Sequence, residues 1–179
     1  MANIVYIATS LDGYIADKNG GLEWLHSIPN PTGDDFGFQA FMDRVDALIM
    51  GRTTFETVCS FDCDWPYSKP VFVLSNSLAQ IPEGYQDKAF LVRGELSEII
   101  AELKQQGYMD LYIDGGATIQ SFLTEDLIDE IIVTSIPVLL GGGTPLFGEL
   151  ASPLHFRLAH SEVLLGSLVK SHYVRQREV

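Results

Sequence analysis

Residues that could bind phosphate groups gather at one predicted edge of this chain. They follow the predicted strands in turn, at positions 10–16, 51–54, 75–76, 93–94 and 114–118. In an open α/β sheet the carboxyl ends of parallel strands meet at one edge, and ligands bind there. Small residues, hydroxyls and guanidinium groups beside helix N-termini suit a ligand rich in phosphate. The sequence therefore predicts a nucleotide site at that edge.

Two features sharpen this prediction. Gly115 and Gly116 open a predicted helix, where the absence of a Cβ lets the backbone approach a pyrophosphate. The alternative for this pair is simply a tight strand-to-helix turn, and the chain has no GxGxxG motif of the standard Rossmann site. Arg52 and Arg93 follow neighbouring strands. Each alone could be a solvated surface arginine, but together they predict a 2′-phosphate site that selects NADP over NAD.

Asp35 is the candidate carboxylate on the substrate side. Apolar residues at helical spacing predict a helix from about residue 35, and they are Phe38, Phe41, Met42 and Val45. Asp35 falls on the same stripe at the helix end, where a cleft would open. The alternatives are a carboxylate that only favours the helix dipole, or a register in which the neighbouring Asp34 lines the cleft.

The elements that must position these residues alternate along the chain. Strands are predicted at 3–9, 47–50, 71–74, 89–92, 111–113 and 130–138, with a hairpin of 156–163 and 167–175. Helices are predicted over 38–45, from Thr53 with a Thr53–Glu56 capping box, from Ser97 as a cap to Gln106, and from Gly116 to Leu123. This alternation predicts a mostly parallel sheet with helices on both faces and an antiparallel C-terminal hairpin.

Composition limits the function classes. The 179 residues fit one domain, 1–179, and 11 Lys plus Arg against 24 Asp plus Glu give a net charge of −13. This charge disfavours nucleic-acid and anionic-membrane partners. No secretory signal or membrane-spanning run is found, so we expect a cytoplasmic protein. Cys59 and Cys63 are four residues apart, a spacing compatible with one helix face, but a metal would need two further ligands and the scattered histidines lack ligand spacing, so we expect no metal site.

Four motifs resemble the dihydrofolate-reductase superfamily, and most closely the reductase domain of riboflavin biosynthesis and its stand-alone relatives. They are IATSLDGYIA at 7–16, LIMGRTTFE at 48–56, IDGGAT at 113–118 and LLGGGTPLF at 139–147, and they occur in family order over nearly the whole chain. The resemblance implies a three-layer αβα sandwich, an NADPH-dependent reductase and a small-molecule heterocyclic substrate. It also implies a homodimer that pairs through the C-terminal strands.

The resemblance assigns cofactor roles residue by residue. Ala8, Ile15 and Ala16 would flank the nicotinamide, and Gly115 and Gly116 would be joined by a cis peptide bond. The other cofactor residues that the resemblance implies are Gly51, Arg52, Thr53 and Thr54 at the phosphates, Leu74, Ser75 and Asn76 at the adenosine, and Ala117, Thr118 and Ile119 at the pyrophosphate. Arg93 joins them at the 2′-phosphate through its position after a predicted strand.

On the substrate side, the resemblance implies that Asp35 grips the heterocycle and that Thr134 hydrogen-bonds to this carboxylate. Trp24 matches a tryptophan beside the mobile loop, and Phe38 and Phe41 would line the substrate site. The pattern departs from folate-reducing enzymes by about five extra residues within 26–33, by Gln39 where those enzymes place an aromatic ring, and by the glycine-rich segment after Val138.

The predicted reaction is therefore hydride transfer from NADPH to a pyrimidine- or pterin-like heterocycle. One candidate substrate is that of 5-amino-6-(5-phosphoribosylamino)uracil reductase. The alternatives are dihydrofolate reduction and a nucleotide-binding module without turnover. The ribose phosphate of the riboflavin precursor would need a cation besides those used for NADPH, and the sequence does not identify it.

Overall fold

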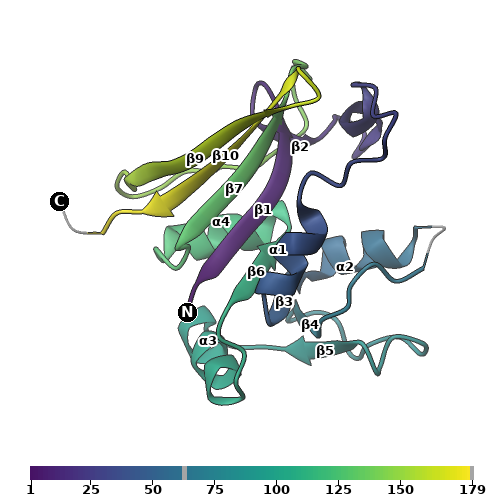
Figure 1. Ribbon diagram of the computed structural model, residues 1–179. Coiled ribbons are helices and arrows are strands. Elements are labelled where there is room, and N and C mark those ends of the chain that lie inside the picture. The colour runs from purple at the N-terminus through teal and green to yellow at the C-terminus, as the bar shows by residue number, and fades with distance from the viewer. Residues whose placement is uncertain (62–63, 178–179) are drawn as a thin grey trace.

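The computed structural model describes residues 1–61 and 64–177 and is built on an eight-stranded sheet (Figure 1). The strand order is β5-β4-β3-β6-β1-β7-β10-β9, and the pairs from β5 to β7 are parallel. The antiparallel β9–β10 hairpin closes one edge. The strands are β1 (Asn3–Ser10), β3 (Ala47–Gly51), β4 (Val71–Leu74), β5 (Ala89–Val92), β6 (Leu111–Asp114), β7 (Glu130–Ile136), β9 (Phe156–Leu164) and β10 (Leu168–Arg175).

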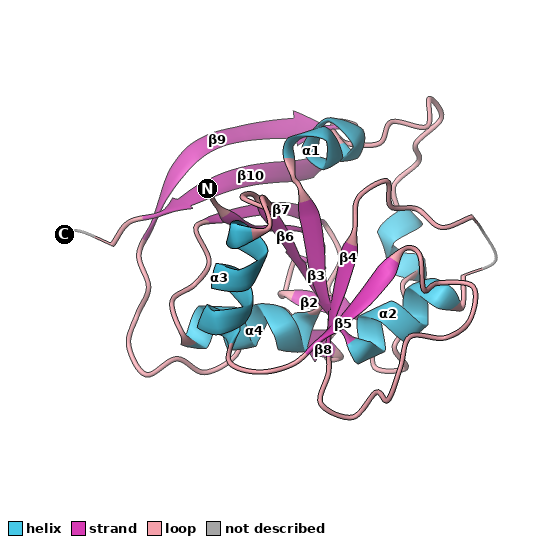
Figure 2. Ribbon diagram, turned by 90° about the horizontal axis from the view of Figure 1, so that it is seen from below, coloured by secondary structure: helices cyan, strands magenta, loops and turns pink. Residues whose placement is uncertain are grey.

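Helices cover both faces of the sheet, and side-chain alternation along each strand fills both cores (Figure 2). α1 (Phe38–Arg44) and α2 (Arg52–Cys59) pack on the face that carries Ile4 and Tyr112. α3 (Leu96–Gln105) and α4 (Gly116–Thr124) pack on the face that carries Val5 and Ile113. The predicted α/β sandwich, with its mostly parallel sheet and antiparallel hairpin, is confirmed.

The two side-chain caps predicted from sequence are wrong. α2 begins at Arg52, one residue before Thr53, and no side chain caps its N-terminus. The carboxylate of Glu56 instead accepts a hydrogen bond from Nε of Arg52 at 2.7 Å, so it does not form the predicted capping box. α3 begins at Leu96, so Ser97 lies within the first turn and does not cap it.

A second, two-stranded sheet holds the loop after β1. β2 (Tyr14–Ala16) pairs with β8 (Thr144–Pro145), and a 3₁₀ helix, η1 (Glu23–His26), follows. Asp12 accepts hydrogen bonds from the backbone N–H groups of Leu140 at 3.1 Å and Gly141 at 2.9 Å. The glycine-rich segment 141–143 is thereby tied to the loop that carries Ile15.

None of the helices in the described parts of the chain is long and apolar enough to span a membrane. Cys59 is a free thiol, whereas Cys63 lies outside the described residues.

Candidate active site

The N-termini of α2 and α4 interlock at the carboxyl edge of the sheet. A Cβ on Gly51 would lie 2.8 Å from Oγ1 of Thr118, at the start of α4. A Cβ on Gly115 would collide with Oγ1 of Thr54, in the first turn of α2. Each strand-to-helix turn therefore needs its glycine because a threonine of the other helix fills the space. The arrangement brings two sets of free backbone N–H groups together, and such groups bind phosphate.

Ile15 reaches the same place from the loop after β1. A Cβ on Gly116 would lie 2.8 Å from Cδ1 of Ile15 and 3.5 Å from the carbonyl oxygen of Pro145. Ala8, in β1, is partly buried and is the in-register partner of Thr134 in β7. The structure thus places Ile15, one of the residues predicted to flank a nicotinamide, next to the glycine pair predicted to meet the pyrophosphate.

The peptide bond between Gly115 and Gly116 is trans, so the cis bond implied by the resemblance is not present. Gly115 has φ +94°, a conformation that disfavours residues with a Cβ. The trans isomer is the favoured one for a bond that does not precede proline. With this trans bond, the positive φ of Gly115 turns the chain from β6 into α4.

The two arginines of the predicted 2′-phosphate site have protein partners. Besides its contact with Glu56, Arg52 donates to Oγ of Ser77 at 3.1 Å, and its side chain is 44% exposed. Arg93 donates to the carbonyl oxygens of Ser75 and Leu78 and so fixes the turn after β4. Of the two arginines, Arg52 is paired with an exposed carboxylate, that of Glu56, and a phosphate could compete with this carboxylate.

The helix predicted from about residue 35 begins only at Phe38, so Asp35 lies three residues before α1 and not on its buried stripe, and its side chain is exposed. Its carboxylate accepts hydrogen bonds from the backbone N–H groups of Gly37 at 2.9 Å and Gln39 at 3.0 Å. These two bonds, with that to Gln39 the larger cause, hold the pKa of Asp35 below its ordinary value. Asp35 is therefore ionised at neutral pH.

The predicted hydrogen bond between Asp35 and Thr134 is not formed within the described residues; the Asp35 carboxylate instead accepts the two backbone N–H groups of Gly37 and Gln39. Asp34 accepts from the N–H group of Phe36 at 2.7 Å and likewise serves the turn into α1. Thr134 is buried in β7, on the face that also carries Ala8 and Lys170.

The predicted aromatic residues of the substrate side differ in exposure. Trp24 is buried and its indole Nε1 donates to the carbonyl oxygen of Gly21 at 3.1 Å. Phe41 is buried between Tyr6 and Tyr112, with ring centroids 4.5 and 5.0 Å away. Phe38 is partly exposed at the start of α1. Phe38 is thus the one of the three whose side chain is not buried.

Two titratable groups beside these residues were not assigned from sequence. Asp114 precedes Gly115 and accepts its N–H at 2.9 Å, and burial raises the pKa of Asp114 to about 6. Its position before the Gly-Gly pair, at the end of an apolar strand, is a signal that could have identified it. Lys170 reaches the Asp35 segment from β10, and only the strand register reveals this.

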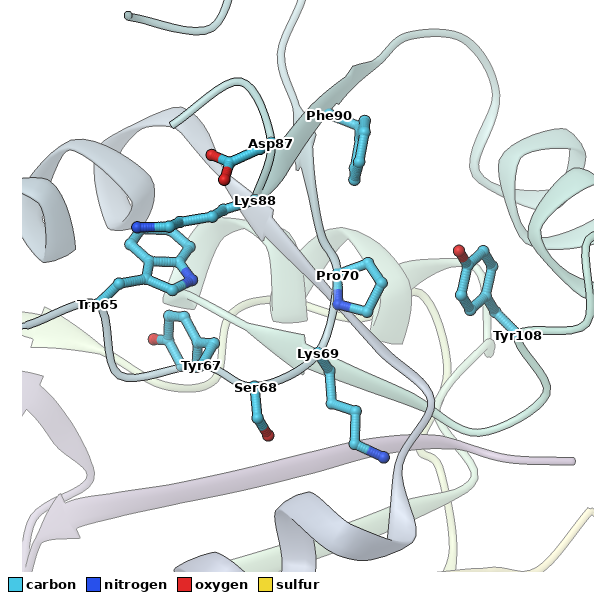
Figure 3. Close-up of a pocket in the computed structure, with 9 residues that line it drawn as sticks. All are labelled: Trp65, Tyr67, Ser68, Lys69, Pro70, Asp87, Lys88, Phe90 and Tyr108. Carbon is cyan, nitrogen blue, oxygen red and sulfur yellow. The ribbon is translucent and has the colours of Figure 1, made fainter. Parts of the chain in front are cut away.

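A hollow lies at the end of the sheet opposite the glycine turns, beside the amino ends of β4 and β5 (Figure 3). Its volume is about 270 Å³, and aromatic rings and two lysines line it. It contains none of the residues predicted to bind the cofactor or substrate, so the carboxyl edge remains the candidate active site.

Comparison with known proteins identifies a family and a fold. The profile of the RibD C-terminal domain family matches residues 3–169. A crystal structure of a protein from Shewanella sp. PV-4, named provisionally for riboflavin biosynthesis, is 64% identical, with a TM-score of 0.97. The match covers 99% of this chain and 100% of that one.

More distant structures share the fold. A diaminohydroxyphosphoribosylaminopyrimidine deaminase/5-amino-6-(5-phosphoribosylamino)uracil reductase from Thermotoga maritima is 15% identical, with a TM-score of 0.73 over 98% of this chain and 56% of that one. Dihydrofolate reductase from Enterococcus faecalis, solved with NADP(H), is 17% identical, with a TM-score of 0.67 over 97% and 96% of the two chains. The fold is therefore that of dihydrofolate reductase.

Proposed function

Because this chain belongs to the RibD C-terminal domain family, we propose that it is an NADPH-dependent reductase of a pyrimidine of the riboflavin-biosynthesis type, working in the cytoplasm. The observation that carries the proposal is the interlocked pair of helix N-termini formed by Gly51, Thr54, Gly115 and Thr118. That cradle suits a pyrophosphate, since backbone N–H groups converge where side chains are excluded.

When bound, NADPH would supply the hydride, and the chain would supply binding and orientation. Ala8 and Ile15 would flank the nicotinamide, and the starts of α2 and α4 would hold the phosphates. Asp35, which is ionised, would accept N–H groups of an amino-heterocycle and orient it. Asp114, with a pKa of about 6, can exchange a proton near neutral pH beside the same cradle.

Spectrophotometry of NADPH oxidation with the purified protein tests this function. We expect turnover with 5-amino-6-(5-phosphoribosylamino)uracil or a related aminopyrimidine, and little with dihydrofolate. Faster reduction of dihydrofolate would favour the folate alternative. Binding of NADPH without turnover on any pyrimidine, pterin or folate would favour a nucleotide-binding module.

Cofactor choice gives a first specific prediction. We expect NADPH to bind at least about tenfold more tightly than NADH, or about 1.4 kcal/mol, because Arg52 can exchange Glu56 for a 2′-phosphate. Arg52→Ala should remove most of this preference, as measured by calorimetric titration with both cofactors. Arg157→Ala, an equal charge change on β9 at the far edge of the sheet, is the control and should keep it. Equal wild-type affinities would contradict the assignment.

A homodimer is the second part of the proposal. The face of β1, β7 and β10 that is turned away from α1 carries a hollow of about 510 Å³ with a largely apolar lining. Exposed apolar side chains extend this face, among them Phe147, Leu150, Leu158, Val163 and Val169. Contiguous apolar surface of this kind favours a protein partner, and a second copy would cover it by two-fold symmetry.

Light scattering at micromolar concentration tests the dimer. We expect twice the chain mass of 19.8 kDa for the wild type. Val163→Glu should give the monomer mass, because Val163 is 68% exposed and a charge there would be buried only in the dimer. A monomer mass for the wild type would refute the proposal.

A further inference from the structure

The chain makes a left-handed corner immediately after Asp35. Phe36 has φ +58° and Gly37 has φ +84°. A positive φ is unfavourable for a residue with a Cβ, so Phe36 keeps it only because its surroundings hold it. The corner matters because the N–H group of Gly37 is one of the two donors that fix the carboxylate of Asp35.

Two donors from the sheet hold this corner through one acceptor. The carbonyl oxygen of Phe36 accepts the hydroxyl of Tyr6 at 2.7 Å and Nζ of Lys170 at 2.6 Å. Tyr6 belongs to β1 and Lys170 to β10, and β7 lies between these strands. The corner is therefore hydrogen-bonded to two strands of the main sheet and not only to residues of its own loop.

The ammonium group of Lys170 is enclosed at this point. Its side chain is 17% exposed, and Nζ lies 5.2 Å from the ring centroid of Tyr6 and 4.0 Å from Oε1 of Glu162. A Cβ on Gly37 would lie 2.8 Å from Nζ, so this glycine leaves the room that the ammonium occupies. A half-buried charge is costly unless it is hydrogen-bonded, and the Phe36 carbonyl meets that need.

We propose that Lys170 is a positioning residue for the substrate side of the site: together with Tyr6 it fixes the Phe36 corner and thereby the orientation of Asp35. This rests on the proposed function, in which Asp35 orients the substrate. The charge of Lys170 also contributes to the lowered pKa of Asp35, after the larger effects of the two backbone donors. Loss of Lys170 should therefore disturb the substrate half of the site and spare the cofactor half.

The test compares Lys170→Met with Lys104→Met, which removes the same charge from α3 on the opposite face. We expect Lys170→Met to lower kcat/KM for the pyrimidine at least about tenfold while the Kd for NADPH stays within about twofold. The amides of Gly37 and Gln39 should exchange hydrogen at least about tenfold faster, as measured by NMR. Lys170→Arg should restore most of the protection because a guanidinium can still donate to the carbonyl of Phe36.

Tyr6→Phe removes the second donor independently. The ring of Tyr6 stacks on Phe41, so this change keeps the packing and should also accelerate exchange at Gly37 and Gln39. If Lys170→Met retains wild-type kcat/KM, or wild-type exchange at both amides, the proposal is overturned. If the wild-type protein reduces no pyrimidine, the proposed function fails. The role of Lys170 can still be decided without turnover: amide exchange and the titration of Asp35, each measured in Lys170→Met, show whether Lys170 positions the corner.

Discussion

Asp35→Asn is expected to lower kcat/KM for the heterocyclic substrate by about 10²-fold or more, while NADPH affinity stays within about twofold. The carboxylate is ionised, and it is aligned by the N–H groups of Gly37 and Gln39. An amide keeps one acceptor oxygen but loses the charge that strengthens a hydrogen bond to an amino-heterocycle. Steady-state kinetics with varied substrate, beside titration with NADPH, separates the two effects.

Asp34→Asn is the matched control for this prediction. Asp34 also accepts a backbone N–H, that of Phe36, and an Asn side chain can keep this bond. We expect near-normal turnover, since Asp34 serves only the turn into α1. If Asp34→Asn loses turnover and Asp35→Asn keeps it, the carboxylate that orients the substrate is Asp34 and not Asp35. Normal turnover in both variants would remove the carboxylate from the mechanism and leave only the cofactor half of the site.

The strands and the glycine cradle could be predicted because their causes are local. Apolar runs such as 47–50 and 111–113 are covered on both faces and lie where their sequences indicate. Gly51 and Gly115 each follow such a strand, so parallel pairing alone brings their turns to one edge. The sequence does not show that each glycine faces a threonine of the other helix, because that contact depends on how α2 and α4 pack.

The substrate side was harder to predict because long-range register builds it. Lys170 and Phe36 are 134 residues apart, and their contact follows from the pairing of β10 with β7. The left-handed corner at Phe36 also has no local signal, since a phenylalanine disfavours positive φ. The predicted bond from Asp35 to Thr134 was likewise not formed, and the carboxylate instead accepts backbone N–H groups within this corner, which the sequence pattern does not indicate.

Gly115→Ala is expected to weaken NADPH binding by about 10²-fold, or about 2.8 kcal/mol, in calorimetric titration. The new Cβ would collide with Oγ1 of Thr54, so α2 and α4 would have to separate where their N-termini meet. The residue would also have to keep φ +94°, which an alanine disfavours. Both effects displace the backbone N–H groups that would hold the pyrophosphate, and the loss should extend to NADH because that group is common to both cofactors.

Gly107→Ala separates the steric effect from the backbone effect. Gly107 follows α3 with φ +96°, almost the value of Gly115, but a Cβ there would meet nothing within 4 Å. Both variants should therefore unfold at a somewhat lower temperature, each losing about 1 kcal/mol from backbone strain. Only Gly115→Ala should lose cofactor affinity. If both variants bind NADPH like the wild type, the interlocked helix N-termini are not the pyrophosphate site; if both lose it equally, the loss reflects stability and not the cradle.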